Sequence, residues 1–256
     1  MSLAKCLEII EKFLPSFWLG IRTTLLVAIT GTIFGFIIGL FVGGIRAIKL
    51  DKTSSKQAML FKKIADTIGK IYIEVFRGTP MMVQAVFIYY LVYTNIVRWD
   101  KMIAAIFVIS INTGAYMAEI IRSGIQAVDK GQYEAGRSTG LSSFQTMMYI
   151  VLPQAIKNAF PAIGNELIVN IKDSSVLSII SITELMFQSN SVAGTTYRFT
   201  ETYFVTAAIY LFLTSVCSFI LNRIENKMNH SKTSLPQSDT NIHSMKIARG
   251  EWLCHL

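Results

Sequence analysis

The sequence predicts an all-α membrane protein with five spanning helices, on the basis of its composition, its apolar runs and the placement of its basic residues. Of the 256 residues, 52% are hydrophobic and 16% are charged, whereas soluble domains carry about 25% charged residues. The mean hydropathy is +0.47. Such a chain has too few charges to cover a water-facing surface, so a soluble enzyme is disfavoured and intrinsic disorder is excluded.

Three stretches without a charged residue are long enough to cross a bilayer, which takes about 20 apolar residues. They predict spanning helices over about 19–46, 78–98 and 202–222. A fourth span is expected over 102–122, where the i, i+3 spacing of Glu119 and Arg122 lets the two charges partly neutralise each other. A fifth, over 160–182, is apolar overall but contains charges. It is therefore expected to face a protein or water-lined interior.

The glycines of the first predicted span recur every four residues, at Gly31, Gly35, Gly39 and Gly43. This spacing makes a ridge of small residues on one helix face, which allows another helix to approach closely. We expect the ridge to pack against a helix of the same chain rather than to form a dimer.

The basic residues predict the orientation, because loops that stay in the cytoplasm carry an excess of Lys and Arg. Most of the 24 Lys and Arg fall in the connection at 46–70, the central loop at 122–137 and the tail after 223. These segments lie on one side of five spans, and that side is expected to be cytoplasmic. The N-terminal segment 1–16 is then outside. The net charge of +8 is explained by topology, and no nucleic-acid partner is expected.

The C-terminal end differs from the rest of the sequence. From about residue 228 it is polar and lacks periodicity, which predicts a flexible cytoplasmic tail over 228–256. All three histidines lie in this tail, and the three cysteines are far apart. We therefore expect no metal site, no cofactor site and no catalytic residue in the chain.

A charged, glycine-containing segment at about 130–153 separates the third and fourth long apolar regions. Its apolar residues Leu141, Phe144, Met147 and Met148 recur at helical spacing and predict a short amphipathic helix at the membrane surface. Such a helix has nothing of its own to bury against. It is expected to bind the bilayer or a partner protein.

This segment resembles the EAA loop of permease subunits of ATP-binding-cassette (ABC) importers. The matching positions are Glu134, Ala135, Gly140, Ile150, Leu152 and Pro153. Gly136 stands where the commonest consensus has alanine, which is a conservative departure. The neighbouring stretches FRGTPMMVQ, GAYMAEIIRSGI and GNELIVNIKDSSVLSII resemble the subfamily that imports polar amino acids. Several motifs in one order are far more specific than any one of them.

The resemblance implies a type I importer permease domain over 17–227, in the bacterial plasma membrane. Its coupling loop would bind a separate ATPase dimer through Glu134, Ala135, Gly136, Gly140 and Leu141. Glu134 would pair with a basic residue of the ATPase, and Gly140 would permit the tight turn that ends the coupling helix.

The resemblance also implies several partner proteins. No G-x-x-x-x-G-K-[ST] phosphate loop occurs in this sequence, so ATP and Mg are expected only on the ATPase. A second permease copy or a similar chain would supply the other half of the pathway. An external binding protein would deliver the amino acid substrate.

The fifth predicted span carries two carboxylates on one face. Seven residues separate Glu166 from Asp173, so they point the same way to within about 20°. Asn165 and Lys172 form a second pair, about 100° round the helix. We expect Glu166 and Asp173 to line the translocation pathway and to bind the cationic part of an amino acid. In the resembling family this helix contributes to the substrate site. The structural alternative is an ion-paired network with Lys172 or Arg77 that only connects helices.

Gln84 and Asn112 are further polar groups inside apolar spans. Each could bind the substrate in the pathway or a neighbouring helix, and the helix contact is slightly favoured for both. Pro153 and Pro161 are expected to bend or break the approach to the charged span.

Two other functional classes remain to be compared with a transport subunit. Paired carboxylates can perform acid–base catalysis, which would suit a membrane-embedded enzyme, and a passive channel would use the same polar groups. Neither class needs a coupling loop. The leading prediction is a non-catalytic permease that works by alternating access, and co-purification with an ATPase would distinguish it.

Glutamine, arginine, histidine and cystine are possible substrates, and the carboxylate pair favours a prominent positive group. A homodimer and a heterodimer of permeases are equally compatible with the sequence.

Overall fold

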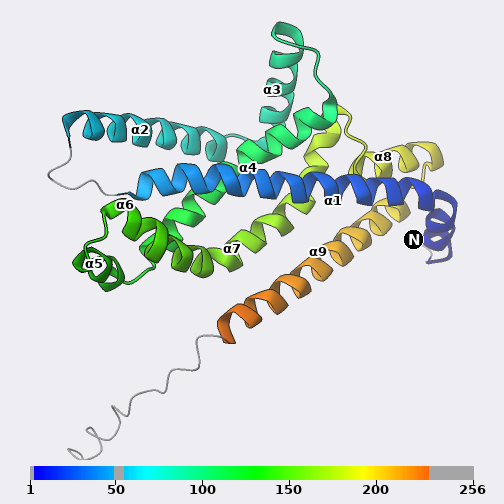
Figure 1. The fold of residues 1–256 in the computed structure, drawn as a ribbon. Helices are drawn as coiled ribbons and strands as arrows, with labels where there is room; N and C mark the ends of the chain where they lie inside the picture. Colours follow the sequence, from blue (N-terminus) through cyan, green and yellow to red (C-terminus); the bar gives the residue numbers. More distant parts are fainter. Residues whose placement is uncertain (1–2, 49–54, 231–256) are drawn as a thin grey trace, which may run out of the picture.

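Helices connected by short segments make up the part of the chain that the structure, a computed structural model, describes, namely residues 3–48 and 55–230 (Figure 1). Eleven helical segments follow one another in chain order: α1 (Leu3–Ala47), α2 (Lys56–Gly78), α3 (Met81–Asn95), α4 (Lys101–Gln126), α5 (Lys130–Ser138), α6 (Ser143–Thr146), the π-helix η1 (Met147–Val151), α7 (Leu152–Asp173), the 3-10 helix η2 (Ser174–Ile180), α8 (Leu185–Thr196) and α9 (Phe199–His230). No strand occurs in the described ranges, so the all-α prediction is confirmed.

Three of the described helices, α1, α4 and α9, are long and apolar enough to cross a membrane. Two bent pairs can each add a span: α2 with α3, which meet at 112°, and the run Ser143–Ile180 with α8, which meet at 57°. The structure thus supports three to five spans. The predicted spans at 19–46, 102–122 and 202–222 fall inside α1, α4 and α9.

The span predicted over 78–98 corresponds to α3, which lies inside those bounds but qualifies as a span only together with α2. Gly78 ends α2, and α3 begins only at Met81. Proline disfavours a helical conformation in the residue before it, and Thr79, which precedes Pro80, is accordingly extended, with φ −123° and ψ 147°. The chain therefore turns sharply here instead of continuing as one helix.

The loop predicted over 46–70 is instead helical from Lys56 onward, where α2 begins. Ser55 caps this helix, and its Oγ accepts a hydrogen bond from the Ala58 amide at 3.2 Å. One face of α2 presents exposed apolar side chains, among them Ile64, Ile68 and Ile71. Charged residues recur along α2 from Lys62 onward, so this amphipathic helix offers no charge-free window long enough to predict a span.

Of the two predicted effects of Pro161, a bend or a break, the break does not occur, because α7 continues through this residue. It lies inside α7, whose first turn contains Pro153, a position at which the missing amide hydrogen has no intrahelical partner anyway. The π-helix η1 directly precedes this turn and makes the transition from α6 to α7. Neighbouring helices, here α4 and α9, help a proline-containing membrane helix to persist.

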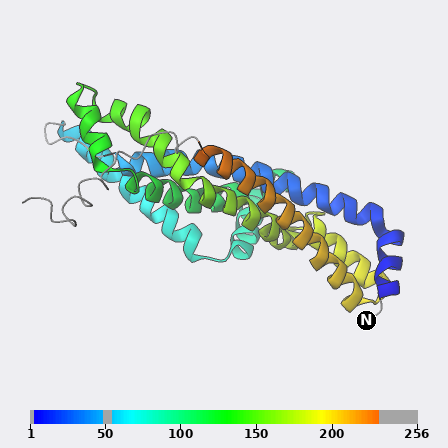
Figure 2. The ribbon, with the colours of Figure 1, turned by 90° about the horizontal axis from the view of Figure 1, so that it is seen from below.

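The glycine ridge of α1 packs against α4, as predicted. Gly31 faces Ile109, Gly35 faces Thr113 and Gly39 faces Met117. The two helices run side by side in the same direction, as their ascending contacts indicate (Figure 2). A Cβ atom at Gly39 would lie 2.3 Å from the Met117 Cβ, a distance that real structures do not allow. The helices therefore approach this closely only because the ridge has no side chains.

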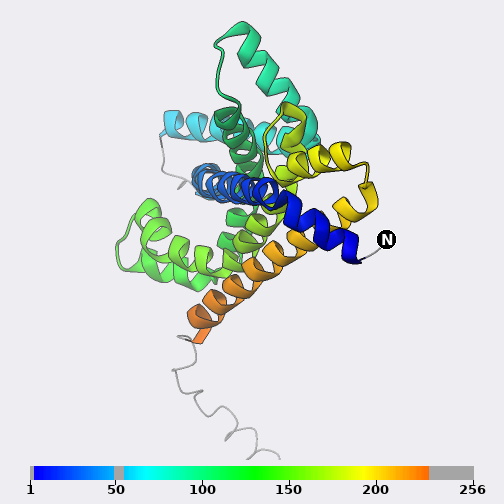
Figure 3. The ribbon, with the colours of Figure 1, turned by 90° about the vertical axis from the view of Figure 1, so that its right-hand side faces the viewer.

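The segment predicted as external, 1–16, is helical from Leu3 onward. A kink at Phe13, with φ −114° and ψ 19°, turns it toward α8 and α9 (Figure 3). Its Cys6 and Ile9 are buried in a cluster with residues of those helices, and Glu8 forms an ion pair with Arg198 at 2.7 Å.

At the other end of the chain, α9 continues to His230, beyond the predicted start of the tail at 228. The remainder of that tail, 231–256, lies outside the described residues.

We predict that Gly39→Ala destabilises the protein, because its Cβ would clash with the Met117 side chain and the Ala118 backbone of α4. Overpacking of this kind costs about 1–3 kcal/mol, which should lower the Tm measured by intrinsic fluorescence in detergent. Gly44→Ala is the control, since nothing lies within 4 Å of the corresponding Cβ, and its Tm should be unchanged. Equal melting of the two variants would contradict close α1–α4 packing.

Candidate functional site

The segment predicted to couple to an ATPase forms two short helices rather than one. Asp129 caps α5, its Oδ1 accepting from the Gly131 amide at 2.7 Å. Gly140, with φ +87°, lies between α5 and α6 in a conformation that side chains rarely adopt. Ser142 then caps α6 in a capping box with Gln145. Of the residues that predicted a short amphipathic helix, Phe144, Met147 and Met148 lie in α6 and η1, and Leu141 lies before them. The turn expected at Gly140 is present.

The two helices of this segment lie at one end of the molecule, next to the C-terminal end of α1 (Figures 1 and 2). Glu134, Ala135 and Gly140 are exposed, and Leu141 is half-buried. The Leu141 carbonyl accepts a hydrogen bond from Arg137 at 2.8 Å, which fixes the turn. The segment therefore presents a structured, charged surface that no part of the described chain covers.

Gly136, in contrast, is buried. A Cβ on this residue would lie 2.7 Å from the Cγ2 of Thr146 and 2.7 Å from the Cδ1 of Ile150. The departure from the usual alanine is therefore not neutral in this chain, because glycine lets α5 pack directly on the start of the next helix.

The two carboxylates of the charged span both lie on α7. Glu166 and Asp173 are partly buried, while Asn165 and Lys172 are exposed. Neither carboxylate forms an ion pair or side-chain hydrogen bond with any residue that the structure describes. At longer range, Asp173 repels Glu166, and the basic residues Arg77 and Lys172 attract Glu166 and Asp173, respectively. This part of α7 is therefore an amphoteric surface whose carboxylates have no close partner in the described ranges.

Arg77 is the basic residue that attracts Glu166 from another helix. It lies in the last turn of α2, at the bend before α3, and is exposed. Its guanidinium carbon is 5.3 Å from the centre of the Tyr116 ring of α4, a cation–π contact. The bend therefore holds a cation against α4, at a distance from which it attracts Glu166 of α7.

A buried amide fixes the carboxylate-bearing helix to its neighbours. Asn170 lies between Glu166 and Asp173 on α7. Its Nδ2 donates to Thr32 Oγ1 of α1 at 2.8 Å, and its Oδ1 accepts from Thr113 Oγ1 of α4 at 3.0 Å. This clamp joins three helices and sets the rotation of α7, a role that the sequence analysis missed. The only signal was an asparagine within an apolar stretch.

Gln84 and Asn112 bind each other and the backbone at the α2–α3 bend. Asn112 Nδ2 donates to Gln84 Oε1 at 2.9 Å, and Gln84 Nε2 donates to the carbonyls of Phe76 and Thr79 at 2.9 and 3.0 Å. Both side chains are buried. They satisfy carbonyl groups at the end of α2 that the bend leaves without helical partners.

Glu184 is a further polar residue that the sequence analysis missed. Its side chain is fully buried and caps α8, accepting from the Met186 and Phe187 amides at 2.8 and 2.7 Å. It also accepts from the Tyr210 hydroxyl of α9 at 3.1 Å. The carboxylate thereby ties α8 to α9. The sequence offered only a glutamate before an apolar residue, and Glu is an uncommon capping residue.

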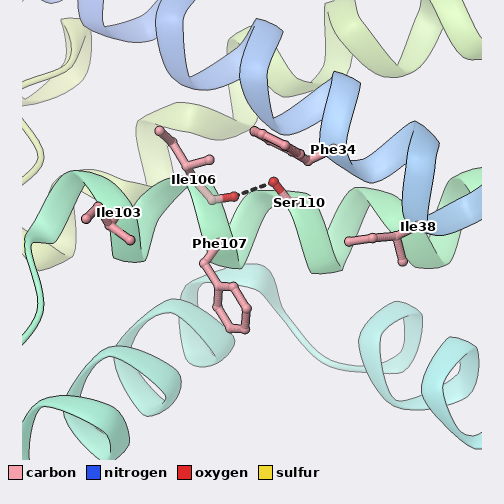
Figure 4. Close-up of a pocket in the computed structure, with 6 residues that line it drawn as sticks. All are labelled: Phe34, Ile38, Ile103, Ile106, Phe107 and Ser110. Carbon is pink, nitrogen blue, oxygen red and sulfur yellow. Dashed lines mark hydrogen bonds between the residues drawn. The ribbon is translucent and has the colours of Figure 1, made fainter. Parts of the chain in front are cut away.

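A cavity of about 380 Å³ between α1 and α4 is lined almost entirely by apolar side chains (Figure 4). Its one polar residue, Ser110, donates its hydroxyl to the Ile106 carbonyl. This cavity offers nothing to a polar ligand, and it is distinct from the amphoteric surface of α7. Within residues 3–48 and 55–230, no three His, Cys, Asp or Glu side chains are grouped so that they could hold a metal ion.

Comparison with known families matches residues 53–230, more than half of the chain, to the binding-protein-dependent transport system inner membrane component. The chain belongs to this family. The glutamine transport system permease protein GlnP of Escherichia coli (strain K12) is 37% identical over 211 residues, which cover 82% of this chain and 91% of that protein. The putative glutamine transport system permease protein GlnP of Rickettsia bellii (strain RML369-C) is 36% identical over 225 residues, covering 86% and 98%.

Two solved structures are also similar to this permease. An amino acid ABC transporter with histidines has a TM-score of 0.74 and 38% identity, covering 85% of this chain and 96% of that chain. The inward-facing MetNI methionine ABC transporter has a TM-score of 0.69 at 21% identity, which indicates a shared fold. The resemblance to permease subunits of polar amino acid ABC importers is confirmed by these matches.

We predict that Gly136→Ala loosens the packing of α5 on the helix that follows it, because the added methyl would meet Thr146 and Ile150. The expected cost is about 1–3 kcal/mol, measured as a lower Tm and faster proteolysis between α5 and α6. Adding Thr146→Ser removes the clashing Cγ2 and should restore part of the loss. Gly194→Ala, with nothing within 4 Å of its Cβ, is the control. Wild-type behaviour of Gly136→Ala alone would contradict the packing argument.

Proposed function

We propose that this permease moves a polar amino acid, namely glutamine, into a bacterial cell by alternating access driven by a separate ATPase dimer. The observation that carries the proposal is the exposed α5–α6 turn in a chain that belongs to a binding-protein-dependent transport family. The turn needs a partner, and the sequence has no phosphate loop with which to hydrolyse ATP itself.

The coupling contact would involve the exposed residues of this turn. Glu134 presents a free carboxylate for a basic residue in the ATPase groove, and Gly140 sets the reversal between the two helices. Gly136 and Leu141 pack inward and transmit movement of α5 to the start of α7. The segments 46–70 and 122–137, which adjoin α5 and the C-terminal end of α1, are rich in basic residues, and this favours a cytoplasmic location for that face and an external N-terminus.

The substrate would pass along the amphoteric surface of α7. Every amino acid carries an ammonium and a carboxylate, so the Glu166 and Asp173 carboxylates can bind the former while Arg77 offers a cation for the latter. A substrate therefore needs no basic side chain in order to bind the two carboxylates. The relatives named as glutamine permeases therefore favour glutamine over arginine.

Gln84 and Asn112 would act on the pathway indirectly. Their hydrogen bonds to each other and to the end of α2 place Arg77 at the bend. One such chain provides half of a pathway, so a second copy or a similar chain, together with an external binding protein, would complete the transporter. The carboxylates could also serve a membrane enzyme or a channel, but neither class accounts for the coupling turn.

We predict that Glu134→Lys, which reverses the charge of the coupling turn, weakens binding of the partner ATPase. Replacing attraction by repulsion at a charge pair should reduce co-purification with the ATPase by about tenfold or more. Deletion of residues 131–141 should abolish it. Glu11→Lys is the matched control, because Glu11 is an exposed carboxylate on the kinked N-terminal segment. Full ATPase binding by the deletion variant would contradict the proposed coupling role.

We also predict that Glu166→Gln and Asp173→Asn raise the KM for glutamine in proteoliposomes that contain the assembled transporter. A hydrogen bond to a charged group contributes about 1.5–3 kcal/mol, which corresponds to a roughly tenfold to hundredfold change. ATPase co-purification should stay at the wild-type level, and Glu11→Gln should behave like the wild type. An unchanged KM in both variants would leave the carboxylates with a structural role only.

A further inference from the structure

A second, polar cavity lies at the coupling end of the membrane-spanning part, between α1, α2 and α4. It has a volume of about 300 Å³ and is lined by Arg46, Asp66, Thr67, Lys70 and Arg122. Nothing in the proposed transport mechanism uses it. Three of its five lining residues are cationic, which makes it suited to an anion.

The two arginines of this cavity are fixed in place. Glu119 of α4 accepts from Arg46 at 3.0 Å through one oxygen and from Arg122 at 2.7 and 2.9 Å through the other. Each arginine carries five N–H donors, so this shared carboxylate uses only part of their capacity. A guanidinium held by one carboxylate is pre-organised to bind a second anion.

The balance of charge in and around the cavity is positive. Asp66 is engaged by Lys62, whose Nζ lies 2.5 Å from both of its carboxylate oxygens. Lys70 lies 3.7 Å from Glu74, too far for a hydrogen bond, and its side chain is two-thirds exposed. Counting Lys62, Glu119 and Glu74 with the lining residues, four cations face three carboxylates, and Lys70 is the cation with the weakest partner.

The position of the cavity indicates where its ligand comes from. Arg46 is the first charged residue after the apolar stretch of α1 that begins at Thr23, so it marks one end of the span. The apolar residues Ile64, Ile68 and Ile71, on the exposed face of α2, border Thr67 and Lys70 in sequence. A ligand with a phosphate and two acyl chains can place its phosphate in the cavity and cover these isoleucines with its acyl chains.

We infer that this cavity binds the phosphate of an anionic phospholipid from the leaflet on the α5–α6 side of the membrane. The inference rests on the chain spanning a bilayer and not on amino acid transport. Basic cavities between membrane helices are known to bind anionic lipid head groups, and here Arg46, Arg122 and Lys70 supply the donors. Bound lipid would link α2 to the α1–α4 pair at the point where their charges meet.

The test measures lipid binding to the purified full-length chain in detergent, by native mass spectrometry, with no nucleotide or amino acid present. The probes are dioctanoyl-phosphatidylglycerol, its zwitterionic phosphatidylcholine counterpart and inorganic phosphate. Wild-type protein should bind phosphatidylglycerol at least about fivefold more tightly than phosphatidylcholine, as expected for one or two basic contacts near a membrane surface.

The informative variant is Lys70→Gln, because Lys70 is exposed and has no short ion pair, so the fold should survive; an unchanged Tm verifies this. Its affinity for phosphatidylglycerol should fall about fivefold, with no change for phosphatidylcholine. Lys63→Gln is the matched control, since Lys63 is an exposed lysine of the same helix outside the cavity lining, and it should bind like the wild type.

Two results would overturn the inference. One is equal phosphatidylglycerol binding by the wild type, Lys70→Gln and Lys63→Gln. The other is displacement of the lipid by millimolar inorganic phosphate together with no preference for phosphatidylglycerol, which would assign the cavity to a soluble anion. The lipid-binding assay contains no substrate. Its outcome therefore does not depend on whether the transport proposal is correct.

Discussion

The close approach of α1 and α4 is the contact on which the rest of the structure depends. Gly31, Gly35 and Gly39 remove the side chains that would separate the two backbones, and dispersion forces between closely packed helices replace the hydrophobic effect inside a bilayer. With α1 and α4 fixed side by side, Thr32 and Thr113 come near enough for one asparagine to bind both. The same pairing places Arg46 beside Glu119. The polar contacts therefore follow from the apolar packing.

The interruptions of the membrane helices follow a second constraint, the need to satisfy backbone groups where water is absent. At the α2–α3 bend, Gln84 accepts from Asn112 and donates to the carbonyls of Phe76 and Thr79. At the start of α8, the carboxylate of Glu184 accepts from two amides. Side chains thus form the hydrogen bonds to backbone groups that have no helical partner where a helix ends. Each interruption becomes a fixed bend, and at the first of them Arg77 lies over the Tyr116 ring of α4.

The polar residues of the chain consequently fall into groups with different roles. Buried amides such as Asn170 find all their partners within the protein, and they position helices. The carboxylates Glu166 and Asp173 find none within the described residues, and they remain available to a ligand. Charges near α5 and α6, such as Arg46 and Arg122, are partly paired through Glu119. Whether a polar group is satisfied internally is therefore the property that separates structural from functional candidates.

The sequence by itself determined the helical class, the apolar spans now found within α1, α4 and α9, the glycine ridge and the turn at Gly140. These depend on composition, on short repeats and on the conformational freedom of glycine, which are all local properties. Only the tertiary structure revealed α2 as a helix, the bend at Pro80 and the continuity of α7 through Pro161, because neighbouring helices decide whether a locally unfavourable segment persists. The partners of Asn170 and Gly136, and the Tyr210 hydroxyl that binds Glu184, lie far along the chain or across a turn. No periodicity encodes such contacts, since they arise only when separate helices pack together.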